Sequence, residues 1–354
     1  MKLVVVGASG NVGTALLRAL STDGGHHVIG VARRIPLSSP PYDNATWTSL
    51  DIADPASVTP LTEIAHGADA VINLAWGFQP ARDVSYLEAV GLGGLDTVLS
   101  AVVAAEVPQV VQMSSVGAYS AGSYGVPVSE SFPTDGIPTS AYSRHKAAAE
   151  RRLDRFEVEH PQVVVTRPRP GLVMNGDAAS SLLRYGVPGV VPARAVDWLP
   201  VLPLDAAFRV PVVHADDVAG ALVAMVRRQA GGAFNLATPT PLDPVVLGRV
   251  LGAQPVSVPR AVLRAAVATA WWLHLERLDP GWIDLAFSVP LMDSGRASRV
   301  LDWNPGKDAE DAVSELVDGM IHHRRTVSPV LRQRSVRDEI TKLRHGSITR
   351  RKLP

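Results

Sequence analysis

Short apolar runs alternate with longer segments of helical periodicity over the first half of the chain. The first run, residues 2–6, ends in three valines without polar alternation, which is typical of a parallel strand buried on both faces. After Asn11, apolar side chains such as Val12, Leu16 and Leu20 recur at helical spacing. This pattern predicts a buried strand that turns tightly onto a helix.

Similar strand-like runs lie at 27–32, 70–75, 107–113 and 163–166, and an alanine- and valine-rich helical run spans 95–105. Strands separated by helical lengths imply a parallel sheet with right-handed crossovers. We therefore expect an α/β protein with a Rossmann-like, doubly wound parallel sheet.

Three glycines stand in the turn between the first strand and its helix, at Gly7, Gly10 and Gly13. Glycine lets the backbone turn sharply, approach a ligand and pack the helix closely against the sheet. The free N–H groups and positive dipole of the following helix would face this turn, which makes it a candidate pyrophosphate site. An ordinary tight turn is the alternative, since the spacing is G-x-x-G-x-x-G rather than G-x-G-x-x-G.

The second half of the chain is less regular, because proline and glycine interrupt it after about residue 170, above all from 185 to 211. We expect residues 1–170 to form a dinucleotide-binding Rossmann domain. Residues 171–324 are predicted to form a smaller, mixed substrate-binding region with segments that return to the Rossmann core. Residues 325–354 are predicted to be a basic, flexible tail.

Composition is that of a protein with a sizeable core, since 46% of the 354 residues are hydrophobic. The absence of cysteine excludes disulfides and thiolate metal sites, and we expect no metal. We see no apolar run that approaches the ~20 residues of a membrane span and no secretory signal, so a cytoplasmic protein is expected. The net charge is zero, but residues 325–354 carry nine Lys/Arg against two Asp/Glu. We interpret this tail as solvated; contact with nucleic acid, a membrane or a subunit is the alternative.

The candidate chemistry begins with Tyr142 and Lys146, which lie four residues apart and so on one face of a helix. An ammonium group at that distance stabilises a phenolate and would lower the pKa of Tyr142 from its usual ~10. Taken alone, a Y-x-x-x-K pair is more often a surface pair. Upstream, however, Ser114 and Ser115 follow the run at 107–113.

These motifs together resemble the extended short-chain dehydrogenases/reductases of the epimerase/dehydratase type. The match covers nearly the whole chain, and its order and spacing are those of the family. It includes the glycine spacing, the S-S-x-x-x-Y segment, the Y-x-x-x-K pair and four further segments at 73–76, 169–171, 214–218 and 292–305.

The resemblance implies a role for each matching residue. Ser115 would orient the substrate oxygen, Tyr142 would act as acid and base, and Lys146 would act as electrostatic and ribose partner. His214 and the Asp216–Asp217 pair would cap and tie a helix start rather than catalyse. The cofactor contacts implied are Gly7, Ser9, Gly10, Asn11, Val12, Gly13, Arg33, Arg34, Asp51, Ile52, Leu74, Ala75, Tyr142, Lys146 and Pro170.

The cofactor is indicated by the end of the second strand, where Arg33 and Arg34 stand and no carboxylate is available. An acidic residue there normally holds the ribose hydroxyls of NAD, and an arginine accommodates the 2′-phosphate of NADP. Adjacent arginines are also common as solvated loop charges. We therefore expect NADP, with NAD as the alternative.

Departures from the family pattern narrow the reaction. Nucleotide-sugar dehydratases carry Asp-Glu after the serine, where this chain has Val116 and Gly117, so sugar dehydration is not expected. Val210 stands where epimerases commonly place a diphosphate-binding arginine, with Arg209 one position further off, and 187–191 and 198–204 are apolar. An uncharged or hydrophobic carbonyl compound therefore competes well with a sugar nucleotide as the substrate. The relay asparagine of the family is missing from 90–94, which puts the proton relay in doubt.

Three functions are consistent with these residues. The first is an NAD(P)-dependent oxidoreductase that moves hydride between nicotinamide and a carbonyl or hydroxyl carbon of a small molecule. The second is an NAD(P)-dependent sugar epimerase with a transient ketone, and the third is a regulator that senses NADP without catalysis. Many relatives form homodimers through the helices beside the active site, and we expect neither a nucleic-acid nor a membrane partner.

Overall fold

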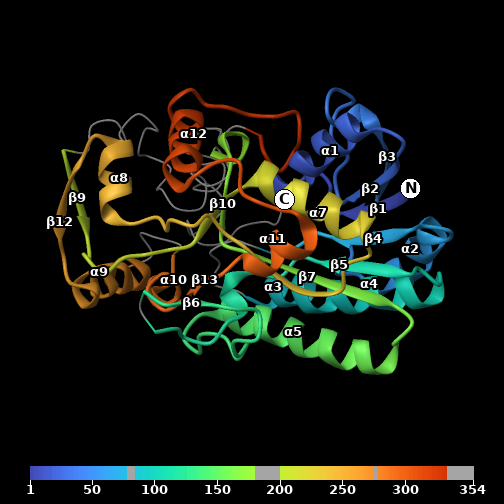
Figure 1. Ribbon diagram of the computed structural model, residues 1–354, viewed down its shortest axis with the longest axis horizontal. Coiled ribbons are helices and arrows are strands. Elements are labelled where there is room, and N and C mark those ends of the chain that lie inside the picture. The colour runs from blue at the N-terminus through green and yellow to red at the C-terminus, as the bar shows by residue number, and fades with distance from the viewer. Residues whose placement is uncertain (78–83, 124, 180–199, 274–277, 333–354) are drawn as a thin grey trace.

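The computed structural model describes residues 1–77, 84–123, 125–179, 200–273 and 278–332. Its centre is a seven-stranded sheet of order β11-β7-β5-β4-β1-β2-β3 in which every neighbouring pair is parallel (Figure 1). This confirms the expected Rossmann-like, doubly wound sheet. Its strands are β1 (Lys2–Val6), β2 (His27–Ala32), β3 (Ala45–Ser49), β4 (Ala70–Asn73), β5 (Gln109–Gln112), β7 (Val164–Pro170) and β11 (Gly232–Leu236).

Helices cover both faces of the sheet. One face packs on α1, α7 and α11 through a core that includes Leu16, Leu222 and Phe234. The other face packs on α2, α4 and α5 through a core that includes Val98 and Leu153. The six helices are α1 (Asn11–Asp23), α2 (Val58–Ala65), α4 (Gly94–Ala104), α5 (Ala141–Glu159), α7 (Ala215–Arg227) and α11 (Gly295–Leu301).

The helical segment Ser85–Ala104 corrects one expectation from the sequence. By length and composition it could cross a membrane, since its mean hydropathy is 1.5 over the relevant window, although we expected no apolar run of that length. In the structure 56% of that window is buried, and α4 packs against the sheet through Leu95, Val98 and Val102. The apolar composition of α4 therefore serves the core.

The chain beyond β7 builds a smaller region and also returns to the sheet. β11 pairs with β7 at the sheet edge, and α7 packs on α1. The other elements form short strand pairs and surrounding helices. These are β6 (Pro127–Val128) with β13 (Leu291–Met292), β8 (Leu172–Met174) with β10 (Val212–His214), β9 (Val201–Leu204) with β12 (Gln254–Ser257), and the helices α3 (Ser85–Glu88), α8 (Pro244–Leu251), α9 (Arg260–Trp272), α10 (Pro280–Ala286) and α12 (Ala309–Ile321).

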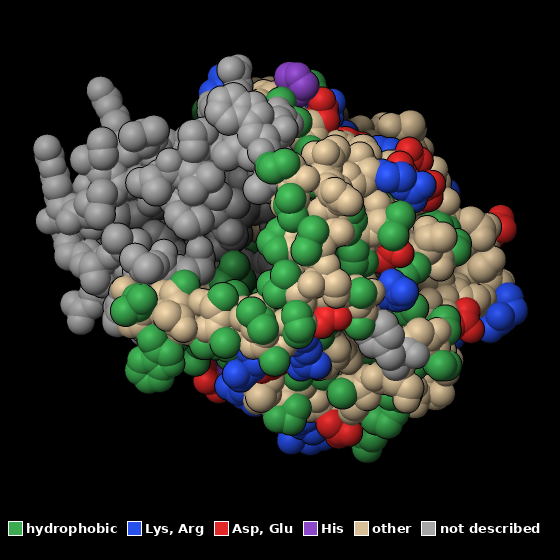
Figure 2. Space-filling view, turned by 90° about the vertical axis from the view of Figure 1, so that its left-hand side faces the viewer, with side chains coloured by type: hydrophobic (Ala, Val, Ile, Leu, Met, Phe, Trp, Pro, Cys, Tyr) green, Lys and Arg blue, Asp and Glu red, His purple; other side chains and the backbone are tan. Residues whose placement is uncertain are grey.

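The end of the molecule that carries α8, α9, β9 and β12 presents many hydrophobic side chains to solvent (Figure 2). Helix α9 buries none of its residues, and Trp272 at its end is 77% exposed. The predicted apolar segment 187–191, and residues 198–199 of the next one, lie outside the described residues. The described part of this region is thus less well packed than the sheet.

Candidate active site

The carboxyl ends of the parallel strands place most predicted site residues at one edge of the sheet. The order of strands reverses between β1 and β4, which is where doubly wound sheets bind their ligands. Residues from the ends of five strands meet at this edge. They are the glycine turn (7–13) after β1, Arg33 and Arg34 after β2, Leu74 and Ala75 after β4, Ser115 after β5, and Pro170 at the end of β7.

The glycine turn needs glycine at two positions for different reasons. Gly7 has a φ of +82°, and a Cβ on it would lie 2.7 Å from the backbone nitrogen of Ala75. A Cβ on Gly13 would lie 2.5 Å from the carbonyl oxygen of Ala8. The turn therefore lets β1 approach the end of β4 and lets α1 pack against the turn itself.

The start of α1 fits a pyrophosphate. Its N-cap, Gly10, has no side chain with which to cap the helix, and the first turn contains no acidic residue. The N–H groups that follow are therefore not satisfied by a capping side chain, and the positive end of the helix dipole favours an anion. Asn11 is fixed by a hydrogen bond from Asn175 to its Oδ1, at 3.0 Å, and Val12 is half-buried.

The adenosine side of the predicted cofactor site contains Arg33, which is exposed. Its guanidinium donates to the hydroxyl of Tyr86 and lies 5.4 Å from the centre of that ring. Asp51 accepts a hydrogen bond from the backbone N–H of Ala53 at 3.1 Å, and Ile52 is buried. The end of β2 thus carries a cation, Arg33, whereas the carboxylate of Asp51 follows β3.

Ser115 and Tyr142, which the sequence predicts to act together, are joined by a hydrogen bond. Ser115 caps a short 3₁₀ turn (Val116–Ala118) by accepting from the N–H of Gly117 at 3.0 Å, and its hydroxyl hydrogen-bonds Tyr142. Tyr142 lies in the first turn of α5, where its ring stacks on Trp282 with centroids 5.5 Å apart. A Cβ on Gly117 would lie 2.8 Å from the Tyr142 ring, so the glycine makes room for the tyrosine.

Lys146 is buried one turn further along α5. Its ammonium donates to the carbonyl of Met113 at 2.9 Å, lies 3.5 Å above the Trp76 ring and lies 6.0 Å from the Tyr142 ring centre. Burial lowers the pKa of Lys146 to about 7, and the nearby Glu150 carboxylate opposes this only in part.

The pKa of Tyr142 differs from the sequence expectation. Burial raises it to about 12, and the hydrogen bond to Ser115 opposes this only in part. The expected lowering by Lys146 is not found, because desolvation of the phenolate is the larger effect and Lys146 is bonded to Met113 instead. Tyr142 is therefore a protonated phenol at neutral pH.

The ring of Trp76 packs against residues 90–94, where the family asparagine is expected. Residues 89–93 form a π-helical turn, and a Cβ on Gly91 would lie 3.1 Å from ring atoms of Trp76. Trp76 in turn covers the ammonium of Lys146. This side of Lys146 is therefore lined by an indole rather than by a polar side chain.

A buried ion-pair network behind Lys146 was not predicted from the sequence. Glu150, four residues after Lys146, accepts from Arg169 at 2.8 and 2.9 Å and from Arg167 at 3.1 Å. Although burial opposes ionisation, these partners hold the pKa of Glu150 below its usual value. Ser114 also donates to Glu150, at 2.6 Å. The network fixes α5 to β7, and the i, i+4 spacing from Lys146 was its only sequence signal.

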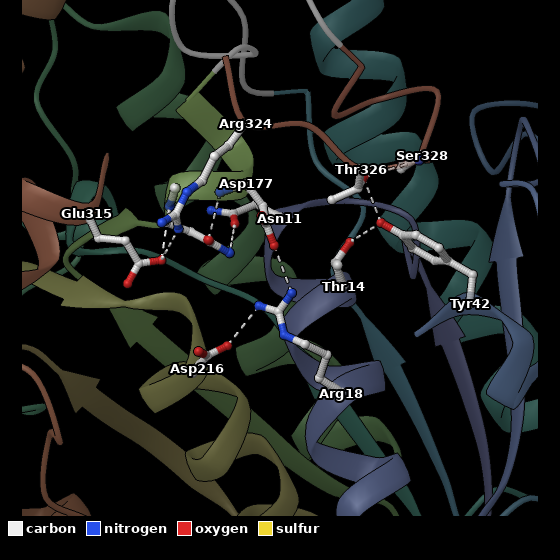
Figure 3. Close-up of polar contacts among 12 residues, drawn as sticks. Asn11, Thr14, Arg18, Tyr42, Asp177, Asp216, Glu315, Arg324, Thr326 and Ser328 are labelled. Atoms are coloured by element: carbon white, nitrogen blue, oxygen red, sulfur yellow. Dashed lines mark hydrogen bonds and ion pairs between the residues drawn. The ribbon is translucent and has the colours of Figure 1, made fainter. Parts of the chain in front are cut away.

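The segment after β10 has the structural role expected from the resemblance. His214 is buried and caps α7 by accepting from the N–H of Asp216 at 3.2 Å. Asp216 pairs with Arg18 of α1 at 2.9 Å (Figure 3). Asp217 accepts from the N–H of Gly306 at 2.8 Å. Among the described residues no group of His, Asp and Glu side chains could hold a metal ion.

Comparison with known proteins identifies the family. A family model named "NAD dependent epimerase/dehydratase family" matches residues 3–237, which is more than half of the chain. The chain belongs to the NAD-dependent epimerase/dehydratase family. This confirms the resemblance to the extended short-chain dehydrogenases/reductases. No curated protein sequence matches the chain.

Solved structures of similar fold include epimerases of this family. UDP-glucose 4-epimerase of Thermotoga maritima, solved with UDP-glucose, is 19% identical with a TM-score of 0.69, and the match covers 91% of this chain and 99% of that chain. The UDP-glucose 4-epimerase of Thermus thermophilus, in complex with NAD, is 18% identical with a TM-score of 0.66, and the match covers 91% of this chain and 99% of that chain. The protein gox2253 is 20% identical with a TM-score of 0.69, and the match covers 92% of this chain and 99% of that chain. These likenesses establish the shared fold.

The pKa of Lys146 predicts how stability depends on pH in this family member. Between about pH 7 and the ordinary lysine pKa of ~10.4, the unfolded chain binds a proton that the folded protein has lost. Stability therefore rises with pH across this window, by up to about 1.4 kcal/mol per pH unit. Above about pH 10 the raised pKa of Tyr142 acts in the opposite direction.

Urea unfolding near pH 6.5 and pH 9 of the wild type and Lys146→Met checks this prediction. The rise in unfolding free energy with pH is expected to be smaller in Lys146→Met. Lys2→Met is the control, because the Lys2 ammonium donates to the carbonyl of His66 at the surface. Parallel pH profiles for wild type and Lys146→Met would show that Lys146 does not titrate in this window.

Proposed function

We propose that this protein is an NAD(P)-dependent oxidoreductase that moves hydride between nicotinamide and a carbonyl or hydroxyl carbon of a small molecule. The observation that carries the proposal is the meeting of Ser115, Tyr142 and Lys146 at the sheet edge that also bears the glycine turn. A hydroxyl that can hold a substrate oxygen, a phenol that can exchange a proton and a buried amine are the parts that this chemistry needs.

The residues that would hold the dinucleotide come from the whole of that edge. The turn at Gly7–Gly13, with Ser9, Asn11 and Val12, would take the pyrophosphate, and Asp51 and Ile52 the adenine. Leu74, Ala75 and Pro170 would line the nicotinamide half, and Lys146 would meet its ribose. When bound, the nicotinamide supplies or accepts the hydride.

The protonation state of Tyr142 suits the role of proton donor in the reductive reaction. In reduction the carbonyl oxygen gains a proton as its carbon gains hydride, and a protonated phenol can donate that proton. Ser115 would hold the same oxygen by a hydrogen bond. The pKa of Tyr142, raised to about 12, keeps the phenol protonated before the reaction begins.

The substrate we propose is uncharged. Arg209, next to the position where an epimerase commonly has its diphosphate-binding arginine, lies 3.7 Å from Asp243 in an ion pair. Val210 itself is buried and pairs with Leu242. A cavity of about 20 Å³ beside Tyr142 is lined by apolar side chains such as Leu87 and Trp282 and also by His145 and the carboxylate of Asp279, which would oppose a diphosphate.

The second candidate is a sugar epimerase, which the fold of the UDP-sugar epimerases favours. It would use Ser115 and Tyr142 twice on one substrate and leave the dinucleotide unchanged at the end. A sensor without catalysis is the third, and the intact Ser115, Tyr142 and Lys146 argue against it. A cytoplasmic location and a homodimer through the helices beside the site stay predictions from the family resemblance.

NADP is the proposed cofactor, with NAD as the alternative. The guanidinium of Arg33 is exposed at the end of β2, and its contact with the Tyr86 hydroxyl does not use all five of its N–H donors. Such a group binds a phosphate well. Arg34, the next residue, is half-buried.

Two parallel assays distinguish the oxidoreductase from the epimerase. NADPH or NADH is mixed with uncharged aldehydes and ketones, and separately UDP-glucose is incubated with NAD⁺. Steady loss of the reduced-nicotinamide absorbance with a carbonyl compound is expected; isomerisation of UDP-glucose without net absorbance change would favour the epimerase.

In Arg33→Ala the affinity for NADP⁺ is expected to fall about tenfold or more, while that for NAD⁺, the internal control, changes little. Equal losses for both would refute the role of Arg33.

A further inference from the structure

The segment Thr326–Leu331, here called the strap, packs on the glycine turn although a flexible tail was expected from residue 325. Ser328 is fully buried and Leu331 is 1% exposed. Residues 333–354 lie outside the described part of the chain. In Figure 3 the strap residues Thr326 and Ser328 lie beside Thr14 and Tyr42, which belong to α1 and to the connection between β2 and β3.

Ser328 connects the strap directly to the glycine turn. Its hydroxyl donates to the carbonyl oxygen of Ser9 at 2.6 Å. The Ser328 hydroxyl oxygen also accepts from the backbone N–H of Val330 at 3.2 Å, and the N–H of Ser328 donates to the hydroxyl of Thr326 at 3.1 Å. The hydroxyl is thus held in one orientation by the strap itself.

Thr326 gives a second, indirect connection. Its hydroxyl oxygen accepts from the hydroxyl of Tyr42 at 2.9 Å, and the Tyr42 oxygen lies 3.0 Å from Oγ1 of Thr14. Thr14 donates to the carbonyl of Gly10 at 2.7 Å. The single protons of Tyr42 and Thr14 are both donated elsewhere, so the 3.0 Å contact between their oxygens is packing and not a hydrogen bond. Thr326 therefore holds Tyr42 beside Thr14, whose own bond fixes the N-cap residue Gly10.

The bond from Ser328 acts on the carbonyl of Ser9, and this fixes the neighbouring N–H group. In a planar trans peptide the N–H of the next residue points opposite to the carbonyl. Holding the Ser9 carbonyl therefore orients the N–H of Gly10, which donates to the carbonyl of Gly7 at 3.0 Å and so closes the turn directly before Asn11. The Asn11 N–H belongs to the first turn of α1, where an anion would be bound.

The rest of the strap is not packed continuously against α1. A cavity of about 490 Å³ lies between them, lined among others by Arg18, Asn44 and Val327. The strap is consequently attached to the glycine turn through a few hydrogen bonds, so the loss of one of them has a measurable effect.

We propose that the strap is a positioning element for the dinucleotide and that Ser328 is its positioning residue. Ser328 holds the glycine turn in the geometry that binds the pyrophosphate. If the docked strap increases the affinity for the dinucleotide by some factor, a bound dinucleotide must favour the docked strap over the detached one by that same factor. The proposal rests on the proposed function only in that a dinucleotide binds at the glycine turn.

Titration of NADP⁺ and of NAD⁺ into the full chain, followed by calorimetry, tests the role of Ser328. Ser328→Ala is expected to bind the preferred dinucleotide about fivefold more weakly, because one hydrogen bond to the turn is lost. The KM for the dinucleotide is expected to rise by a similar factor, and kcat to change by less. Val300→Ala, at a 39% exposed position of α11 outside the strap, is the control and keeps the wild-type Kd.

Proteolysis tests the reciprocal effect. Trypsin can cleave after Arg325, an exposed residue directly before the strap. Saturating NADP⁺ is expected to slow this cleavage severalfold in the wild type and less in Ser328→Ala. A chain that ends at Arg332 is expected to keep the wild-type Kd, whereas one that ends at Arg325 binds at least tenfold more weakly.

The outcomes separate this proposal from the proposed function. Wild-type Kd in Ser328→Ala, or cleavage that the dinucleotide does not slow, overturns the strap proposal. If the wild type binds neither dinucleotide, the proposed function fails together with it. If the wild type binds but catalyses no redox reaction, only the proposed function fails. If the chain that ends at Arg325 does not fold, the Kd of Ser328→Ala still tests the strap proposal.

Discussion

Tyr142→Phe is expected to lower kcat by about a thousandfold, with little change in the Kd for the dinucleotide. General acid–base catalysis by a positioned side chain contributes roughly 10²- to 10⁴-fold, and phenylalanine has no proton to give. The ring itself is kept, so stacking on Trp282 and packing over Gly117 are retained. Steady-state kinetics with the best carbonyl substrate, together with calorimetric titration of the dinucleotide, would measure both quantities.

A substitution elsewhere on α5 provides the control for Tyr142→Phe. Val158 is 82% exposed near the end of the same helix, so Val158→Ala should keep both kcat and Kd. Unchanged turnover in Tyr142→Phe would contradict the assignment of Tyr142 as proton donor. A large loss of dinucleotide affinity in that variant would show instead that the phenol acts mainly in binding.

Gly7→Ala is expected to abolish measurable dinucleotide binding and to destabilise the protein by roughly 3 kcal/mol. At a φ of +82° an L side chain is strained, and the new Cβ would lie 2.7 Å from the backbone nitrogen of Ala75. Because the backbone at Ala75 cannot move aside without disturbing the sheet, β1 and the end of β4 would be forced apart. That movement disturbs the turn and the nicotinamide side together. Urea unfolding and calorimetry measure the two effects.

Gly220→Ala is the matched control for Gly7→Ala. Gly220 lies inside α7 with nothing within 4 Å of its would-be Cβ, so alanine fits. There it should stabilise the helix by about 0.5–1 kcal/mol without changing the Kd. Wild-type affinity in Gly7→Ala would mean that the glycine turn is not where the dinucleotide binds.

Local sequence signals predicted the N-terminal half of the fold well. The first two strands have the predicted bounds at residues 2–6 and 27–32, because valine-rich runs next to glycine leave few alternatives. The strand expected at 70–75 ends earlier, at Asn73, whose side chain accepts from the N–H of Ala75 and turns the chain. The edge strand β11 was not predicted, since it follows a long excursion of the chain and its pairing is non-local.

The site was predictable only as far as local motifs reach. Tyr142 was found from its spacing to Lys146 and Ser115 from the family resemblance, and the structure brings Ser115 and Tyr142 into contact. The contact of Trp76 with Lys146 and the ion pairs of Glu150 join residues distant in sequence. The pKa of Tyr142 depends on burial, which the spacing of two residues does not reveal. The strap was missed because the basic residues around it indicated a solvated tail.

The close contact between Gly117 and the Tyr142 ring limits how the chemistry of this protein could evolve. The nucleotide-sugar dehydratases that this chain resembles carry Asp-Glu at the positions of Val116 and Gly117. The glutamate would place its Cβ 2.8 Å from the Tyr142 ring. Introducing the two acidic residues would therefore displace Tyr142, the proposed proton donor. An ancestor or descendant that dehydrates sugars would have to differ in the placement of α5 as well.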